Sequence, residues 1–159
     1  MKKSSPPSLS PRRQRNRALM VQTILDTARA IMREEGVAAL SMQELARRLD
    51  MRAPSLYHYF SGKAEIYDAL FRLGFTLYAE QMQPALPEAQ TWQEEIRLAF
   101  EAYLAFAVQN PDLYQLCFER PAPGFVPSAE SLQFSVGLLR TFYERAAQWP
   151  ATVDTRLPP

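Results

Sequence analysis

The fold is decided by the stretch Ser41–Lys63, SMQELARRLDMRAPSLYHYFSGK. Its first four residues, Ser41-Met42-Gln43-Glu44, form a capping box, in which the serine hydroxyl and the glutamate carboxylate satisfy free backbone donors at the start of a helix. Asp50-Met51-Arg52-Ala53 predicts a short turn, because Pro54 disfavours helical geometry at Ala53 and itself fits the first position of a new helix. The stretch therefore predicts two short helices joined by a tight turn.

A longer helix is predicted immediately before this pair. Its apolar residues recur at spacings of three and four and so share one helical face: Val21, Ile24, Leu25, Ala28, Ile31 and Met32. Gly36 ends this helix, because glycine adopts the left-handed backbone of a helix terminus without a steric penalty. A long helix packed behind two short ones is a tri-helical helix-turn-helix unit.

The second helix of the pair, from Pro54 to about Phe60, is predicted to enter a DNA major groove, which is about 12 Å wide. Leu56 and Phe60 are its expected buried anchors. Arg52 at the turn suits guanine O6 and N7 or a phosphate, and the hydroxyls of Ser55 and the nearby tyrosines suit phosphates or thymine methyls. Packing alone is the other interpretation of those tyrosines.

The rest of the chain predicts further helices and no strand. A helix from about Ser61 to Met82 has apolar residues on two sides, so we interpret it as the connector between two domains. Thr91-Trp92-Gln93-Glu94 is a second capping box and starts a helix to about Gln109. Asn110-Pro111 starts a short helix, and a seventh helix runs from Ser128 to about Trp149.

Charge is distributed unevenly along the 159 residues. Residues 1–63 hold 12 Lys and Arg against 5 Asp and Glu, whereas residues 64–159 hold 6 against 12. This asymmetry is typical of a nucleic-acid-binding module joined to a domain with another role. Residues 1–17, with Arg12, Arg13, Arg15 and Arg17, are predicted to be a disordered basic arm that is either a solvated tail or a contact to phosphate or the minor groove.

Several functional classes are not expected. No apolar run reaches the roughly 18 residues that a membrane-spanning helix needs, so a cytoplasmic protein without membrane contact is predicted. Cys117 and His58 are the single cysteine and the single histidine, and each is too isolated to suggest a metal site or a catalytic group. We therefore expect no enzymatic activity and no cofactor.

The residues 41–49, SMQELARRL, together with Ala53-Pro54-Ser55-Leu56-Tyr57-His58-Tyr59-Phe60 and Lys63, resemble the DNA-binding signature of the TetR/AcrR family. The resemblance covers about residues 20–70. The family usually has glycine at the end of the second helix, where this chain has Asp50, which adopts the left-handed conformation less comfortably. The resemblance implies that the operator DNA is faced by Ser41, Gln43, Arg52, Ala53, Pro54, Ser55, Tyr57, His58, Tyr59 and Lys63.

The same resemblance implies a helical C-terminal domain that dimerises and encloses a small-molecule effector. Six aromatic residues are candidates to line that pocket, although aromatic residues at helical spacing also form ordinary core: Phe100, Tyr103, Phe106, Tyr114, Phe118 and Phe142. Family members commonly continue with two further long helices that build the dimer interface, whereas this chain ends soon after its seventh predicted helix. The predicted fold is thus all-α, with about seven helices and less than the usual family length.

The predicted domains are a basic arm at 1–17, a helix-turn-helix domain at 18–64, an effector-binding and dimerisation domain at 65–150 and a flexible tail at 151–159. The predicted function is that of a ligand-responsive regulator, most often a repressor in this family. Such a regulator binds a palindromic operator as a homodimer and is released by its effector. The alternative is a truncated regulator, or a helical protein–protein adaptor, without strong specific DNA binding.

Overall fold

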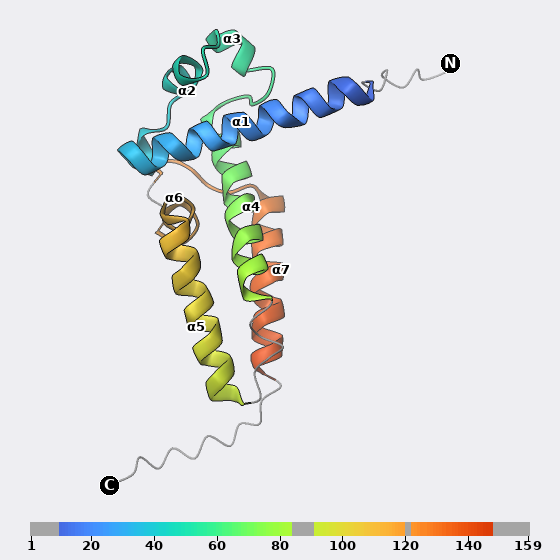
Figure 1. The fold of residues 1–159 in the computed structure, drawn as a ribbon, viewed down its shortest axis with the longest axis vertical. Coiled ribbons are helices and arrows are strands. Elements are labelled where there is room, and N and C mark those ends of the chain that lie inside the picture. The colour runs from blue at the N-terminus through green and yellow to red at the C-terminus, as the bar shows by residue number, and fades with distance from the viewer. Residues whose placement is uncertain (1–9, 84–90, 120–121, 148–159) are drawn as a thin grey trace. The chain divides into compact units, whose positions relative to one another are not determined.

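The structure is a computed structural model that describes residues 10–83, 91–119 and 122–147 (Figure 1). These residues are predominantly helical and contain no strand, so the all-α prediction is confirmed. The α-helices are α1 Pro11–Glu35, α2 Met42–Arg48, α3 Ala53–Leu56, α4 Lys63–Met82, α5 Trp92–Gln109, α6 Pro111–Tyr114 and α7 Ala129–Ala146. A 3₁₀ turn, η1 Val37–Ala39, follows α1, and a π-helical turn, η3 Gln115–Glu119, follows α6.

The chain divides into two compact units, Met1–Ile66 and Tyr67–Pro159. Helix α4 begins in the first unit and continues into the second. The predicted boundary, between residues 64 and 65, lies two residues earlier in the chain than this division. The functions assigned to the two domains remain predictions, and the tail at 151–159 lies outside the described residues.

Helix α1 corrects the predicted extent of the basic arm. The sequence predicts an arm as far as residue 17, but α1 begins at Pro11 with Ser10 as its N-cap. Proline suits the first turn of a helix, and the arginines and glutamine that follow are good helix formers, which explains the earlier start. Residues 1–9 of the predicted arm lie outside the described residues. Gly36 ends the helix with φ +91°, and its N–H donates to the Met32 carbonyl at 3.0 Å.

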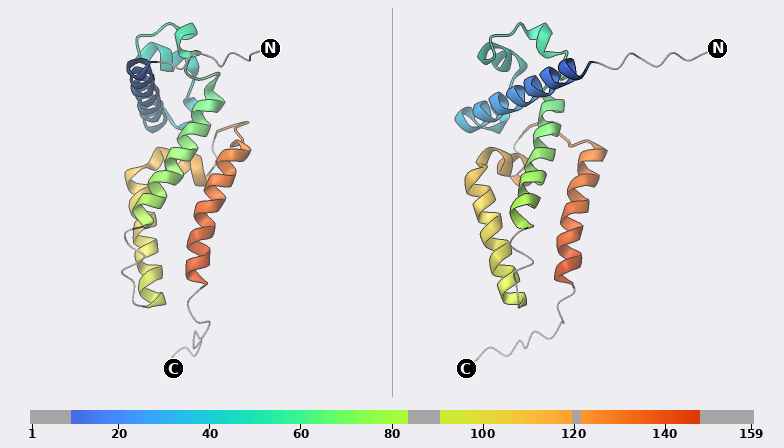
Figure 2. Two further views of the ribbon diagram at one scale, coloured as in Figure 1. Left: turned by 90° about the vertical axis from the view of Figure 1, so that its right-hand side faces the viewer. Right: turned by 45° about the vertical axis from the view of Figure 1, so that its right-hand side comes forward.

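In the first unit, α2 and α3 lie together on one side of α1 (Figures 1 and 2). The face of α1 predicted to be apolar is the buried one, apart from Val21, which is half-buried. The core of this unit consists of Ile24, Leu25, Ala28, Ile31, Met32, Val37, Leu40, Leu45, Ala46, Leu56, Phe60 and Ile66. Burial of these side chains from three short segments and one long helix is what holds the pair of short helices in place.

In the second unit, α5 and α7 run alongside α4 (Figures 1 and 2). Tyr78 of α4 is the centre of their packing, because its ring lies within 6.5 Å of the rings of Tyr103, Phe106, Phe118 and Phe142. Burial raises the pKa of the Tyr78 phenol above its ordinary value. Tyr78 therefore joins α4 to α5, η3 and α7 in the second unit.

The helix starts predicted at Thr91, from its capping box, and at about Ser128 are confirmed. Thr91 caps α5, accepting a hydrogen bond from the Glu94 N–H at 3.2 Å, and Ser128 caps α7, accepting from the Ser131 N–H at 3.1 Å. The Asp68 carboxylate of α4 accepts from the Ser128 N–H at 2.7 Å and from the Ser131 hydroxyl at 2.7 Å. Although burial acts to raise it, these bonds hold the pKa of Asp68 below its ordinary value.

The apolar side chains of α5 are only partly buried. Phe106 is fully buried and Ala102 is nearly so, but Ile96, Phe100 and Leu104 are exposed. The exposed three recur every four residues and so form one stripe along the helix. Apolar periodicity identified the helix correctly but did not distinguish the buried side from the exposed one.

Candidate nucleic-acid interface

The turn between α2 and α3 is a Schellman motif. The Met51 N–H donates to the Ala46 carbonyl at 2.9 Å, and the Asp50 N–H donates to the Arg47 carbonyl at 3.2 Å. Asp50 lies in the left-handed region with φ +51°, the only residue other than glycine with positive φ in the described chain. The sequence-based expectation that Asp50 adopts this conformation is confirmed, and the turn closes as it would with glycine.

Helix α3 is shorter than predicted. The sequence predicts a helix from Pro54 to about Phe60, but the α-helical residues are Ala53–Leu56, with Pro54 at the second position. The backbone then tightens, since the His58 N–H donates to the Ser55 carbonyl at 3.3 Å and the Tyr59 N–H donates to the Leu56 carbonyl at 2.9 Å. These bonds between residues three apart are 3₁₀-like, which is common where a helix ends.

Two apolar side chains hold α3 from behind, as predicted. Leu56 has no exposed surface and Phe60 is 5% exposed. Both belong to the core of the first unit, so the opposite side of this short segment is left facing solvent. A segment anchored in this way presents its remaining side chains in a fixed arrangement.

The side chains predicted to face DNA lie at the surface. Tyr57 is 52% exposed. Gln43, Arg52, Pro54, His58 and Lys63 are also exposed, whereas Ser41, Ala53, Ser55 and Tyr59 are half-buried. The predicted interface requires that the two tyrosines and Arg52 are not buried inside the protein, and none of the three is. Their contact with DNA stays a prediction.

Helix α2 is held to the end of α1 by an ionic network. The Glu44 carboxylate accepts hydrogen bonds from Arg47 at 2.7 and 2.8 Å and from Arg48 at 2.7 Å, and these bonds lower the pKa of Glu44 to about 2. Arg48 also pairs with Glu34 and Glu35 at 2.5 Å each. Arg48 is therefore paired with carboxylates of the protein itself.

Lys63 is the first residue of α4 and lies beyond a bend at Ser61 and Gly62. The Ser61 N–H donates to the Glu65 carboxylate at 2.6 Å, which satisfies a backbone donor at this helix start. The sequence predicted that a helix begins at about Ser61, and the Glu65 contact was not foreseen. A capping box places its glutamate three residues after the capping residue, whereas Glu65 lies four after Ser61, so that motif gave no signal for this contact.

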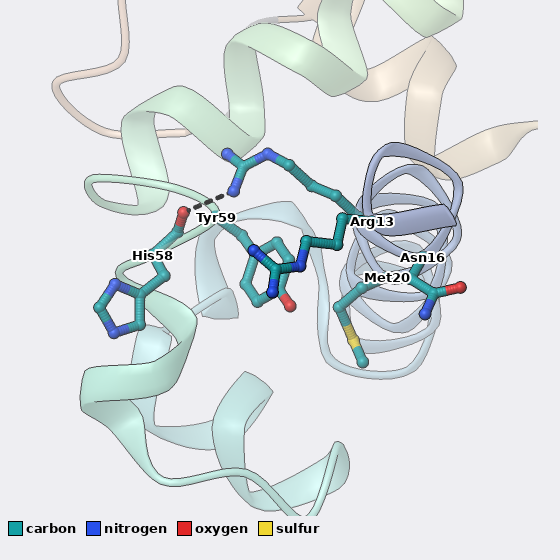
Figure 3. A pocket seen from close by; sticks show the side chains of 6 residues that line it. Arg13, Asn16, Met20, His58 and Tyr59 are labelled. Carbon is teal, nitrogen blue, oxygen red and sulfur yellow. Dashed lines mark hydrogen bonds between the residues drawn. The ribbon is translucent and has the colours of Figure 1, made fainter. Parts of the chain in front are cut away.

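Arg17 is the residue whose contribution the sequence analysis missed. The sequence predicted for Arg17 either a solvated position or a contact with phosphate or the minor groove, but no contact within the protein. In the structure its guanidinium donates to the His58 carbonyl at 3.0 Å (Figure 3). It also lies over the Tyr59 ring at 5.3 Å from the ring centre, a cation–π contact. Arg17 thus ties α1 to the segment that follows α3.

The six aromatic residues predicted to line an effector pocket lie in the second unit. Five of the rings form one connected set of contacts, whereas Phe142 contacts the Tyr78 ring. The Tyr103 hydroxyl donates to the Tyr114 hydroxyl at 2.9 Å. That hydrogen bond, with burial, raises the pKa of Tyr103 to about 12. Phe106 is fully buried, whereas Phe100 is 58% exposed. A pocket-lining role stays a prediction for all six residues.

Two findings limit other kinds of site. Within residues 10–83, 91–119 and 122–147, no three His, Cys, Asp or Glu side chains are grouped as a metal site would require. None of the helices in that part of the chain has the length and apolarity to cross a membrane.

Comparison with known proteins agrees with this geometry. Residues 24–70, which hold most of the first unit, match the family described as "Bacterial regulatory proteins, tetR family". The HTH-type transcriptional regulator Rv1816 of Mycobacterium tuberculosis is 26% identical over 137 residues, which cover 84% of this chain and 58% of that protein. The uncharacterized HTH-type transcriptional regulator YobS of Bacillus subtilis is 33% identical over 97 residues, which cover 61% of this chain and 50% of that protein.

Among solved structures, the TetR family transcriptional regulator PfmR from Thermus thermophilus aligns with a TM-score of 0.61 at 25% identity. The alignment covers 78% of this chain and 65% of that chain. The chain therefore spans between half and two thirds of the length of these similar proteins.

Proposed function

We propose that this chain, which belongs to the TetR family of bacterial regulatory proteins, is a transcriptional regulator that binds operator DNA through α2, α3 and the start of α4. The observation that carries the proposal is that the segment 52–60, which contains α3, has one buried side and one exposed side. Leu56 and Phe60 are buried, while Arg52, Tyr57 and His58 face solvent from the same short segment. A polar, aromatic and basic surface on a rigidly held segment of this size fits a major groove.

The roles within the interface follow from side-chain chemistry. Arg52 precedes the helix and can donate two hydrogen bonds to guanine O6 and N7, which would make it a reader of sequence. Tyr57 and Ser55 carry hydroxyls that suit phosphate oxygens, and Lys63 supplies a cation at the start of α4. Gln43 and Ser41 lie at the start of α2, where a phosphate contact would fix the orientation of the unit on the duplex.

The finer proposal is a repressor that acts as a homodimer and responds to a small molecule. Two copies would present α3 to successive major grooves about 34–36 Å apart, which requires a palindromic operator. An effector held by the aromatic residues of the second unit would favour one of two conformations and release the DNA. The ring contacts around Tyr78 support this site, because they gather large apolar surfaces beside the Tyr103 and Tyr114 hydroxyls.

The test is selection of bound sequences from a random DNA pool, followed by titration of the selected duplex. A palindromic consensus supports both DNA binding and two-fold symmetry. We expect Arg52→Ala and Tyr57→Phe to weaken binding by about 1–3 kcal/mol and about 1 kcal/mol respectively. Arg97→Ala and Tyr143→Phe are matched controls, because both are exposed side chains of the second unit. Unchanged affinity in both test variants would remove α3 from the interface.

The alternative is a helical adaptor that binds another protein. It is supported by the exposed apolar stripe on α5, Ile96, Phe100 and Leu104, since clustered exposed apolar side chains are typical of interaction surfaces. Sedimentation of the purified chain distinguishes the two proposals. A monomer whose DNA affinity is weak and independent of sequence favours the adaptor, and a dimer that binds one palindrome favours the repressor.

A further inference from the structure

The first unit contains a hollow between the beginning of α1 and the segment that follows α3. Its volume is about 370 Å³, and it is lined by Arg13, Asn16, Arg17, Met20, His58 and Tyr59. Figure 3 shows that the Arg13 side chain extends from α1 toward Tyr59, and that His58 faces this space with its carbonyl while its imidazole points away. Two of its six lining residues are arginines and none is acidic, so the hollow is suited to an anion.

The two arginines of the hollow differ in the contacts that their guanidinium groups make. Arg17 is fixed by its bond to the His58 carbonyl and by the Tyr59 ring beneath it. Arg13 lies four residues earlier and therefore on the same face of α1, where it is exposed. In the described part of the chain, no carboxylate is paired with either guanidinium. The hollow thus combines one positioned cation with one that remains available to a ligand.

The charge pattern of α1 is unfavourable for the isolated helix. Arg12, Arg13, Arg15 and Arg17 occupy its first two turns, and its first turn holds no acidic residue. Cations at this end oppose the helix dipole, and arginines four residues apart repel each other. Electrostatics within the helix therefore does not account for the placement of these charges, whereas an anionic partner would convert the repulsion into attraction.

We infer that the hollow between Arg13, Arg17, His58 and Tyr59 binds a phosphate of the DNA backbone beside the groove that α3 enters. This inference rests on the proposed function. Tyr59 lies only two residues after Tyr57 and four after Ser55, so a phosphate in the hollow would belong to the same duplex that α3 contacts. Arg13 pairs directly with the phosphate, and Arg17 acts as a positioning residue that holds Tyr59 and the His58 backbone around it.

The test compares Arg13→Ala with Arg12→Ala, because the two arginines are adjacent in α1 and only Arg13 lines the hollow. Binding of the selected duplex and of a scrambled duplex is titrated at several salt concentrations. One lost phosphate contact lowers the slope of log Kd against log salt by about 1 and weakens both duplexes about equally. We expect this result, with an affinity loss of about 5- to 20-fold at low salt, for Arg13→Ala, and a loss below about 2-fold for Arg12→Ala.

The outcomes separate this inference from the proposed function. If the wild-type chain binds the selected duplex and Arg13→Ala binds like the wild type, or like Arg12→Ala, the hollow is not a phosphate site although DNA binding stands. If the wild-type chain binds no duplex, the proposed function fails. Inorganic pyrophosphate is then titrated while the Nε–Hε resonances of Arg13 and Arg17 are observed by NMR. A shift there without duplex binding overturns the assignment to DNA, and no shift overturns the anion site altogether.

Discussion

Substitution of Gly74 by alanine tests how closely α4 and η3 approach each other in the second unit. A Cβ at Gly74 would lie 2.5 Å from the Cys117 sulfur and 3.5 Å from the Leu113 Cβ. Ordinary contacts of a Cβ are 3.4–4 Å, so the sulfur would have to move by about an ångström. Cys117 is 6% exposed, and its Sγ donates to the Phe71 carbonyl at 3.7 Å, which leaves it little freedom to move.

The expected change in the free energy of unfolding is the sum of two opposing effects. Overpacking of a filled core costs about 1–3 kcal/mol, whereas replacing glycine by alanine inside a helix gains about 1 kcal/mol. We therefore expect Gly74→Ala to lower the free energy of unfolding by up to about 2 kcal/mol. Cys117→Ala alone should cost about 1 kcal/mol, because it removes one buried atom. In the double variant the new methyl group occupies the space left by the sulfur, so the two costs should not add.

The assay is urea unfolding of the four proteins of this double-mutant cycle, followed by far-UV circular dichroism. We expect a favourable coupling free energy of about 1–3 kcal/mol between the two positions. Additivity within about 0.5 kcal/mol would refute the reasoning, as would a Gly74→Ala variant that is more stable than the wild type by the full helix-propensity gain. Either result would mean that α4 and η3 are further apart than the structure places them.

Two predictions concern the first unit. Asp50 has φ +51°, so Asp50→Ala should lower the free energy of unfolding by about 0.5–1 kcal/mol, while Asp50→Gly should be at least as stable as the wild type. If urea titration shows equal stability of all three proteins, the left-handed turn is contradicted. Because Arg47 and Arg48 lower the pKa of Glu44 to about 2, its carboxylate stabilises the fold above its ordinary pKa and loses that contribution as pH falls toward about 2. The urea midpoint should therefore fall more steeply below about pH 5 in the wild type than in Glu44→Gln, and parallel pH profiles would argue against the network.

Local chemistry explains why the helix order could be predicted from the sequence. Ser41 and Thr91 cap the helices that their capping boxes predicted, and Gly36 and Asp50 adopt positive φ where the chain was expected to turn. Each of these signals depends on residues within four positions of one another. Such signals need no knowledge of the tertiary structure, because the groups they satisfy are backbone groups of the same segment.

The errors arose where distant residues decide the outcome. The first turns of α1 were predicted to be a polar arm, because they have no apolar periodicity. In the structure the helix includes Pro11–Arg17, and Arg17 contacts His58, 41 residues away in the sequence. Similarly, the apolar pattern of α5 gives no sign that Phe100 is exposed while Phe106 is buried. A hydrophobic stripe specifies that a helix forms, but the neighbouring helices determine which part of the stripe is covered.

Because α3 is short, the candidate interface is positioned mainly by residues outside this helix. One helical turn fixes many backbone dihedrals for few hydrogen bonds, so a segment of four residues is not stable by itself. Its geometry instead depends on Leu56 and Phe60 in the core, on the turn closed by Asp50, and on the bond from Arg17 to the His58 carbonyl. Because α1 supplies the last of these supports, changes in the first turns of α1 should alter how α3 meets DNA even where they touch no base.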